Sequence, residues 1–161
     1  MRTSTRIRAV EPQDSTALEG LFDTLGYPAS PATIRGRLIR LRSDSSYAAW
    51  VATQVGSVVG FAAGHLLRPV QEDRPAAQLI ALVTAPDHER TGAGTALCRE
   101  VETWARTNGA RRVLVNSGEQ RLENHVFYEG PRLRPDRDPS HEGARRQGQR
   151  EPWCRCAALR Q

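Results

Sequence analysis

A near-continuous apolar run, a glycine turn and a helical pattern follow one another between residues 77 and 109. The run AQLIALVT (77–84) is typical of a central strand that is covered on both faces of a sheet. Gly92 and Gly94 lie in the turn that follows. Apolar side chains then recur at helical spacing, at Ala96, Leu97, Val101, Trp104 and Ala105, until Asn108 and Gly109 end the pattern. The order predicts a buried strand that leads through a tight turn directly into a helix.

The glycine turn is a candidate phosphate site. A turn of this kind aims several backbone N–H groups at one point, and the positive end of the helix dipole adds to the attraction for an anion. Glycines also let a ligand approach the backbone closely. A tight strand-to-helix connection with no ligand satisfies the same pattern. Neither standard nucleotide fingerprint is present, because Leu97 stands at the third glycine position of G-x-G-x-x-G and no Gly-Lys-Ser/Thr follows.

The rest of the first 129 residues divides into short strands and amphipathic helices. Ser30 and Pro31 mark a helix start, Gly26 marks a helix end, and Gly56 separates two strands of a predicted hairpin. We expect strands at 5–10, 47–54, 57–67 and 111–118, and helices within 11–26, 30–43 and 120–129.

The net charge is concentrated at one end of the chain. Residues 1–129 hold 15 arginines and 14 acidic residues, whereas residues 130–161 hold eight arginines and four acidic residues. The body is thus nearly neutral, and a nucleic-acid partner is not predicted. The sequence has no apolar run of membrane-spanning length and no apolar segment of a secretory signal, so we expect a cytoplasmic protein without a membrane partner. Three cysteines indicate neither a disulfide framework nor a metal site.

The element order and the turn together resemble the GNAT superfamily of acetyl-CoA-dependent N-acetyltransferases. The resemblance covers residues 4–129, and PDHERTGAGTAL (86–97) is similar to the family motif Q/R-x-x-G-x-G/A after a Pro-led turn. One departure is Glu89, which stands where the family usually has Arg or Gln. The resemblance implies an α/β fold with a mixed central sheet flanked by helices.

The resemblance also implies a site for acetyl-CoA, the co-substrate, between two splayed central strands. Main-chain groups of Leu82, Val83 and Thr84 would bind pantetheine. The pyrophosphate would lie on the turn, held by backbone amides from Arg90 to Thr95, among residues Glu89, Arg90, Thr91, Gly92, Ala93, Gly94 and Thr95. Tyr128 occupies the place of the family's tyrosine, whose hydroxyl protonates the departing thiolate; packing beside Phe127 is the alternative interpretation.

A general base is harder to assign. Many members of the family use a glutamate on the strand before the glycine turn, where this chain has Gln78, which cannot accept the proton. His65 ends the preceding strand and is a candidate, because imidazoles titrate near neutral pH. A half-exposed structural histidine satisfies the same observation. Glu119 and His125 are weaker candidates.

The segment after Gly130 does not continue the family pattern. It holds four prolines, eight arginines and no apolar period, so we expect an irregular tail at 130–161 and missing or disrupted C-terminal strands beside a domain at 1–129. Its degenerate codons permit a family-like turn in a shifted frame. We therefore hypothesise that residues 131–161 are translated out of frame; a divergent tail is the alternative.

The resemblance implies transfer of acetyl from acetyl-CoA to a primary amine by direct attack in a ternary complex. A degenerate domain that binds CoA without turnover is the main alternative, and a nucleic-acid binder using the arginine-rich tail is a weaker one. The acceptor is open between a small-molecule amine and a peptide amine. A homodimer is left open as well.

Overall fold

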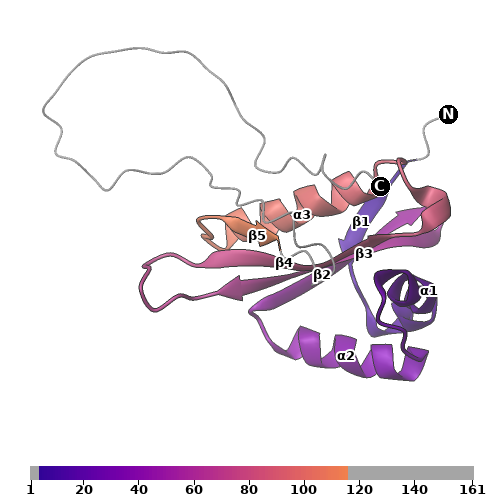
Figure 1. Cartoon of the computed structure of the whole chain (residues 1–161), viewed down its shortest axis with the longest axis horizontal. Coiled ribbons are helices and arrows are strands. Elements are labelled where there is room, and N and C mark those ends of the chain that lie inside the picture. Colours follow the sequence, from indigo (N-terminus) through magenta and orange to yellow (C-terminus); the bar gives the residue numbers. More distant parts are fainter. Residues whose placement is uncertain (1–3, 116–161) are drawn as a thin grey trace, which may run out of the picture.

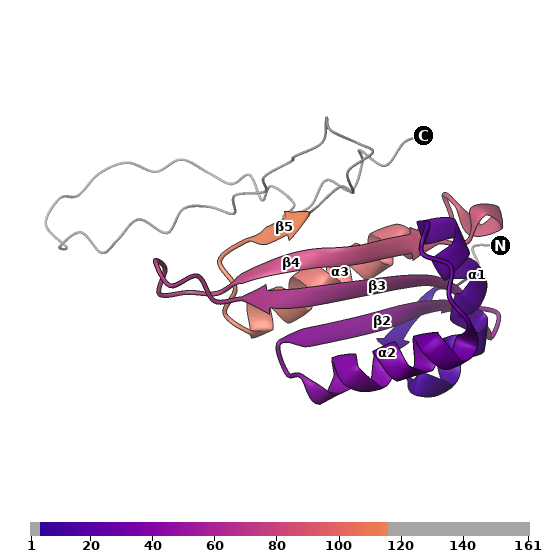
Figure 2. The same cartoon turned by 60° about the horizontal axis from the view of Figure 1, so that its bottom comes forward.

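The computed structural model describes residues 4–115, which form a five-stranded mixed sheet between two layers of helix (Figure 1). The strands lie in sequence order, β1 to β5, with antiparallel pairing from β1 to β4 and parallel pairing of β4 with β5 (Figure 2). Their bounds are Arg6–Ala9 (β1), Tyr47–Gln54 (β2), Ser57–Leu67 (β3), Ala76–Thr84 (β4) and Val113–Val115 (β5). The predicted α/β fold is confirmed.

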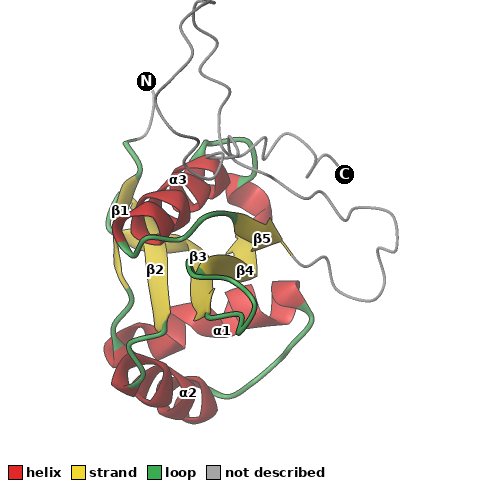
Figure 3. Ribbon diagram, turned by 90° about the vertical axis from the view of Figure 1, so that its left-hand side faces the viewer, coloured by secondary structure: helices red, strands yellow, loops and turns green. Residues whose placement is uncertain are grey.

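Helices α1 (Ser15–Leu25) and α2 (Pro31–Ser43) cover one face of the sheet, and α3 (Ala93–Thr107) covers the other (Figure 3). Short 3₁₀ helices at Pro12–Asp14 and Pro86–His88 precede α1 and α3. Two separate apolar clusters fill the space between the sheet and these helices. The connection from β4 through α3 to β5 is the helical crossover that a parallel strand pair needs.

Local sequence signals determine the ends of the first two helices. Gly26 ends α1 in the left-handed conformation at φ 90°, a backbone shape that glycine adopts without steric cost. The Ser30 hydroxyl caps α2 by accepting from the Thr33 backbone N–H at 3.2 Å, and Pro31 occupies the first helical position. The inward residues Leu18 and Ile34 are fully buried.

The β2–β3 hairpin turns through Val55 and Gly56. Both residues have positive φ, 49° and 80°, as a two-residue turn between right-twisted strands requires. Glycine suits this shape, whereas a β-branched valine is strained in it. Val55 is 91% exposed, so no packing compensates.

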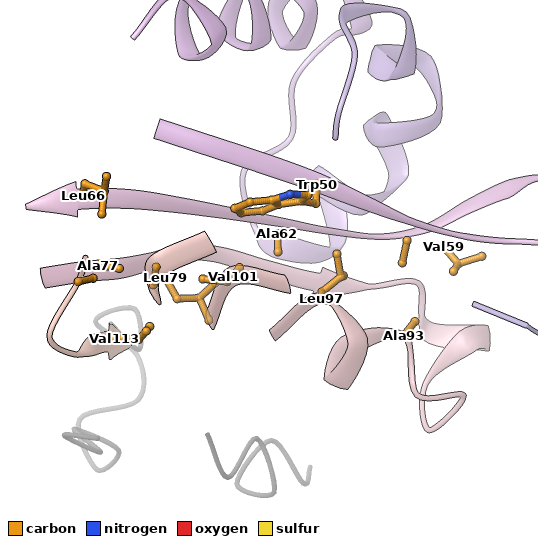
Figure 4. Packing of buried hydrophobic residues seen from close by; sticks show 13 residues of the cluster. Trp50, Val59, Ala62, Leu66, Ala77, Leu79, Ala93, Leu97, Val101 and Val113 are labelled. Atoms are coloured by element: carbon orange, nitrogen blue, oxygen red, sulfur yellow. The ribbon is translucent and has the colours of Figure 1, made fainter. Parts of the chain in front are cut away.

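The cluster beneath α3 is closely packed. Figure 4 shows Leu97 and Val101 of α3 directed toward the sheet, near Ala62 and Leu79. Gly64 lies where β3 passes under Trp104, and a Cβ atom built at this position would lie 2.7 Å from Trp104 Cζ3. The absence of a side chain at Gly64 therefore lets the indole of α3 approach the sheet.

One extra residue interrupts β4. Ala63 pairs with Ala81 while the neighbouring Gly64 pairs with Leu79, so Ile80 is the unpaired residue of a β-bulge. Leu79 packs in the α3 cluster, Ala81 packs on the α1/α2 side, and Ile80 is 44% exposed. The bulge lies in the middle of the near-continuous apolar run at 77–84.

Candidate functional site

The start of α3 presents free backbone donors. Gly92 is the N-cap residue, at φ 89°, and the first helical hydrogen bond runs from Ala96 N to Gly92 O at 3.0 Å. The N–H groups of Ala93, Gly94 and Thr95 therefore precede the first intrahelical bond and have no acceptor within α3. Gly92 provides no side-chain cap for them. Three donors at the positive end of a 15-residue helix form a suitable cradle for an anion.

Two glycines of the turn have different local roles. Gly92 has the positive φ that an L side chain rarely adopts, so the backbone itself requires glycine there. Gly94 has no such requirement, since a Cβ atom would meet only the Thr84 methyl group at an ordinary 3.5 Å. Nothing in the described chain therefore needs Gly94 to lack a side chain. A small residue at this position leaves the donors open to a ligand.

The edge of β4 adjoins this cradle. β5 pairs with β4 only at Ala77, Gln78 and Leu79, up to Val115, where the described residues end. Within residues 4–115, the stretch 80–84 has no strand partner on that edge. Leu82, Val83 and Thr84 lie on this stretch, and the Thr84 methyl group reaches Gly94. The structure thus brings together the two groups of residues that the resemblance assigns to acetyl-CoA.

A buried glutamine, which sequence reasoning missed, connects the turn to the sheet. Gln54 ends β2 with only 4% of its surface exposed. Its Nε2 donates to Thr91 Oγ1 at 3.0 Å and to Thr5 Oγ1 at 2.8 Å. Gln54 and Thr91 are 37 positions apart in the sequence, and no local pattern indicates their contact.

The turn itself is polar and exposed. Glu89 and Arg90 are both exposed, and Arg90 has φ 62°. Asp87 Oδ1 lies 3.1 Å from His88 Nδ1, and the proximity of the imidazole lowers the pKa of Asp87. The acidic side chain of Glu89 is thus exposed to solvent.

A second group of polar side chains lies across the sheet. Tyr47, His65 and Gln78 are cross-strand neighbours on β2, β3 and β4, and alternation places them on the α1/α2 side. The Tyr47 and His65 rings stack with centroids 4.1 Å apart. Hydrogen bonds from Ser46, with a smaller contribution from the charge of His65, lower the pKa of Asp44. His65 thus has an aromatic ring on one side and a carboxylate nearby.

This row lies some distance along the sheet from the turn. Gly60 adjoins Thr84 near the turn, and His65 follows five residues later on β3, which corresponds to about 17 Å of strand. His65 therefore does not contact the helix cradle. The Tyr47–His65–Gln78 row and the helix cradle therefore lie at opposite ends of β4.

Several predicted residues lie outside the described range. These are Tyr128, Glu119 and His125, the expected helix at 120–129, and the tail at 130–161. The predictions of missing C-terminal strands and of an out-of-frame segment concern the same residues. Among the described residues, no group of three or more His, Cys, Asp and Glu side chains could bind a metal. None of the described helices combines the length and apolar character of a membrane span.

Comparison with known proteins defines the class. Residues 16–129 match the acetyltransferase (GNAT) family. A search of curated proteins found no match. Among solved structures, a GNAT family acetyltransferase from Staphylococcus aureus has a TM-score of 0.68 at 18% identity, covering 77% of this chain and 94% of that chain.

Other similar structures have different named activities. An aminoglycoside acetyltransferase from an uncultured soil metagenomic sample has a TM-score of 0.57 at 23% identity, with 72% of this chain and 81% of that chain covered. A ribosomal-protein-alanine N-acetyltransferase from Brucella melitensis has a TM-score of 0.59 at 18% identity, with 72% of this chain and 81% of that chain covered. These similarities define the fold.

The chain belongs to the GNAT acetyltransferase family, because the family model spans most of its length. It is accordingly an acyltransferase within the transferase class, and the family as a whole uses acetyl-CoA.

Proposed function

We propose that this chain transfers acetyl from acetyl-CoA to a primary amine by direct attack in a ternary complex. The observation that carries the proposal is the start of α3, where the N–H groups of Ala93, Gly94 and Thr95 have no acceptor within the helix and the described residues do not require glycine at position 94. The unpaired edge of β4 next to it supports the same interpretation.

The described residues suit the shape and charge of acetyl-CoA. The N–H groups at Ala93, Gly94 and Thr95 would hold the pyrophosphate, and the small Gly94 leaves room for it. Main-chain groups of Leu82, Val83 and Thr84 would bind the amides of pantetheine along the open edge. Bound acetyl-CoA supplies an activated acetyl thioester. Because backbone N–H groups would make most of the contacts to the pyrophosphate, the exposed Glu89 does not exclude binding.

An ammonium acceptor has to lose a proton before its nitrogen can attack. His65 is the proposed base, and its neighbour Gln78 on the same face cannot accept a proton. Stacking on Tyr47 restricts the orientation of the imidazole. Tyr128 is the proposed acid that protonates the leaving thiolate.

The acceptor is proposed as a class only. Similar structures are named for aminoglycosides and for a ribosomal protein alanine, so both small-molecule and peptide amines fit the fold. The second candidate function is CoA binding without turnover. Gln78 in place of a carboxylate favours it, because the described part of β4 then provides no proton acceptor.

Calorimetry with acetyl-CoA tests the proposal. Gly94→Glu adds a side chain and a negative charge at the helix cradle, and we expect binding to be lost in a folded protein. Gly20→Glu is the matched control, because Gly20 lies exposed on α1 with nothing within 4 Å of its Cβ position. Equal affinity in Gly94→Glu and wild type would refute the phosphate site. Binding by the wild type without release of CoA thiol from any of a panel of amines would favour the second function.

A further inference from the structure

A directed chain of hydrogen bonds leads from the end of β2 into the glycine turn. Thr91 Oγ1 donates its only proton to the His88 carbonyl at 2.7 Å. It must therefore act as acceptor toward Gln54 Nε2 at 3.0 Å. This determines the orientation of the amide, with its nitrogen facing the two threonine oxygens of Thr91 and Thr5.

Removal of a partner from this chain is costly because of where Gln54 lies. The side chain is 4% exposed, so water cannot easily replace a lost acceptor. A buried donor without a partner costs about 1–3 kcal/mol, more than the net value of the bond itself. The native position of Thr91 is thus favoured over positions that break the contact.

The backbone hydrogen bonds of the turn are long, from Glu89 N to Pro86 O at 3.5 Å and from Thr91 N to His88 O at 3.4 Å. Residues 89–92 are all exposed, so apolar burial contributes little to their position. Arg90 has φ 62° and Gly92 has φ 89°, and the first of these is unfavourable for a residue with a side chain. A strained and exposed segment persists only where neighbouring contacts determine its conformation. Among the described residues, the shorter side-chain hydrogen bonds of Thr91 with His88 and Gln54 add to the backbone bonds and restrain the turn.

We propose that Gln54 and Thr91 are positioning residues that hold the glycine turn in the shape that receives the pyrophosphate of acetyl-CoA. The inference rests on the proposed function. Thr91 directly precedes Gly92, the N-cap of α3, so movement of Thr91 redirects the N–H groups that follow. A turn ordered before binding saves the ordering cost on association, and this saving appears as affinity.

Paired substitutions separate this role from a merely structural one. Thr91→Val keeps the side-chain shape but removes the hydroxyl. Thr91→Ser keeps the hydroxyl. Gln54→Glu is nearly isosteric but replaces the donor by an acceptor. Thr5→Val is the matched control, because it makes the same chemical change at the other oxygen bound by the same amide nitrogen.

Binding is measured by calorimetry with acetyl-CoA and with 3′-phosphoadenosine 5′-diphosphate, the pyrophosphate-bearing part of CoA. Thermal unfolding is recorded for each variant. We expect Thr91→Val and Gln54→Glu to raise the Kd of both ligands about tenfold, as expected for a lost hydrogen bond. Thr91→Ser recovers most of the affinity lost in Thr91→Val. Thr5→Val leaves both Kd values near wild type even if it lowers the Tm as much as Thr91→Val does.

Three other results would each contradict a different part of the inference. Unchanged Kd values in Thr91→Val and Gln54→Glu, with only the Tm lowered, would reduce the hydrogen bonds to a structural role. Equal losses of affinity in Thr5→Val and Thr91→Val would remove the specific role of the turn. Failure of the wild type to bind acetyl-CoA would refute the proposed function, and the positioning role with it.

Discussion

Substitution of Gly64 by alanine tests the close contact between β3 and α3. The added Cβ atom would lie 2.7 Å from Trp104 Cζ3, whereas carbon atoms pack best at about 3.5–4.0 Å. One side must therefore move by roughly 1 Å. β3 is hydrogen-bonded to β2 on one side and to β4 on the other, and the Trp104 ring lies edge-on to Trp50 with centroids 5.6 Å apart.

The sheet restrains β3 and the Trp50 contact restrains the partly buried Trp104 ring, so we expect a cost in the ordinary range of overpacking. Such substitutions cost about 1–3 kcal/mol, and we expect Gly64→Ala to lower the free energy of unfolding by about 2 kcal/mol. For a chain of this size the Tm falls by about 6 °C. Urea unfolding and calorimetry measure the two quantities.

Two further variants control for effects of alanine itself. Gly20→Ala lies on exposed α1 with nothing within 4 Å of the new atom, so it should raise the free energy of unfolding by about 0.5–1 kcal/mol. In a Trp104→Leu background the cost of Gly64→Ala should fall to less than about 0.5 kcal/mol. Wild-type stability in Gly64→Ala, or an equal cost in both backgrounds, would refute the argument.

Three other predictions concern the hairpin, the stability in acid and the proposed general acid Tyr128. Val55→Asn should raise the Tm by about 3 °C, because Asn tolerates the positive φ and no packing is lost; a lower Tm would contradict this. Two hydrogen bonds from Arg8 lower the pKa of Asp14 below its ordinary 3.8, so this carboxylate stabilises the fold above pH about 4 and the contribution is lost as the pH falls through the lowered pKa. Urea unfolding between pH 7 and pH 3 should show Asp14→Asn about 2 kcal/mol less stable at neutral pH, with the difference narrowing in acid; a constant difference would contradict the linkage. Tyr128→Phe should lower kcat about 100-fold with little change in acetyl-CoA affinity, and wild-type turnover would leave Tyr128 a packing role.

Short-range signals made most elements of the described fold predictable. Ser30 with Pro31 and Gly26 act within one helical turn of their positions, so their effect is visible in the sequence itself. Gly56 likewise determines where β2 turns into β3. The order of strand, turn and helix around Gly92 then led to the correct family.

Features that depend on register or on distant contacts could not be predicted. The run 77–84 is so uniformly apolar that no break in alternation reveals the bulge at Ile80. The contact of Gln54 with Thr91 joins a strand end to a loop far along the chain. Tyr47 and His65 become neighbours only once the register of β2 on β3 is known.

The bulge at Ile80 gives β4 an unusual tolerance to changes in chain length. Leu79 faces α3, Ala81 faces α1 and Leu82 again faces α3, so the side chains alternate regularly if Ile80 is left out of the count. Deletion at this position would leave every other side chain of the strand on its present face. A deletion away from the bulge, beyond Leu79 or Ala81, would turn part of the strand over and expose its apolar side chains. Homologous sequences that differ in length by one residue within this strand can therefore share both cores, provided that the gap in their alignment falls at position 80.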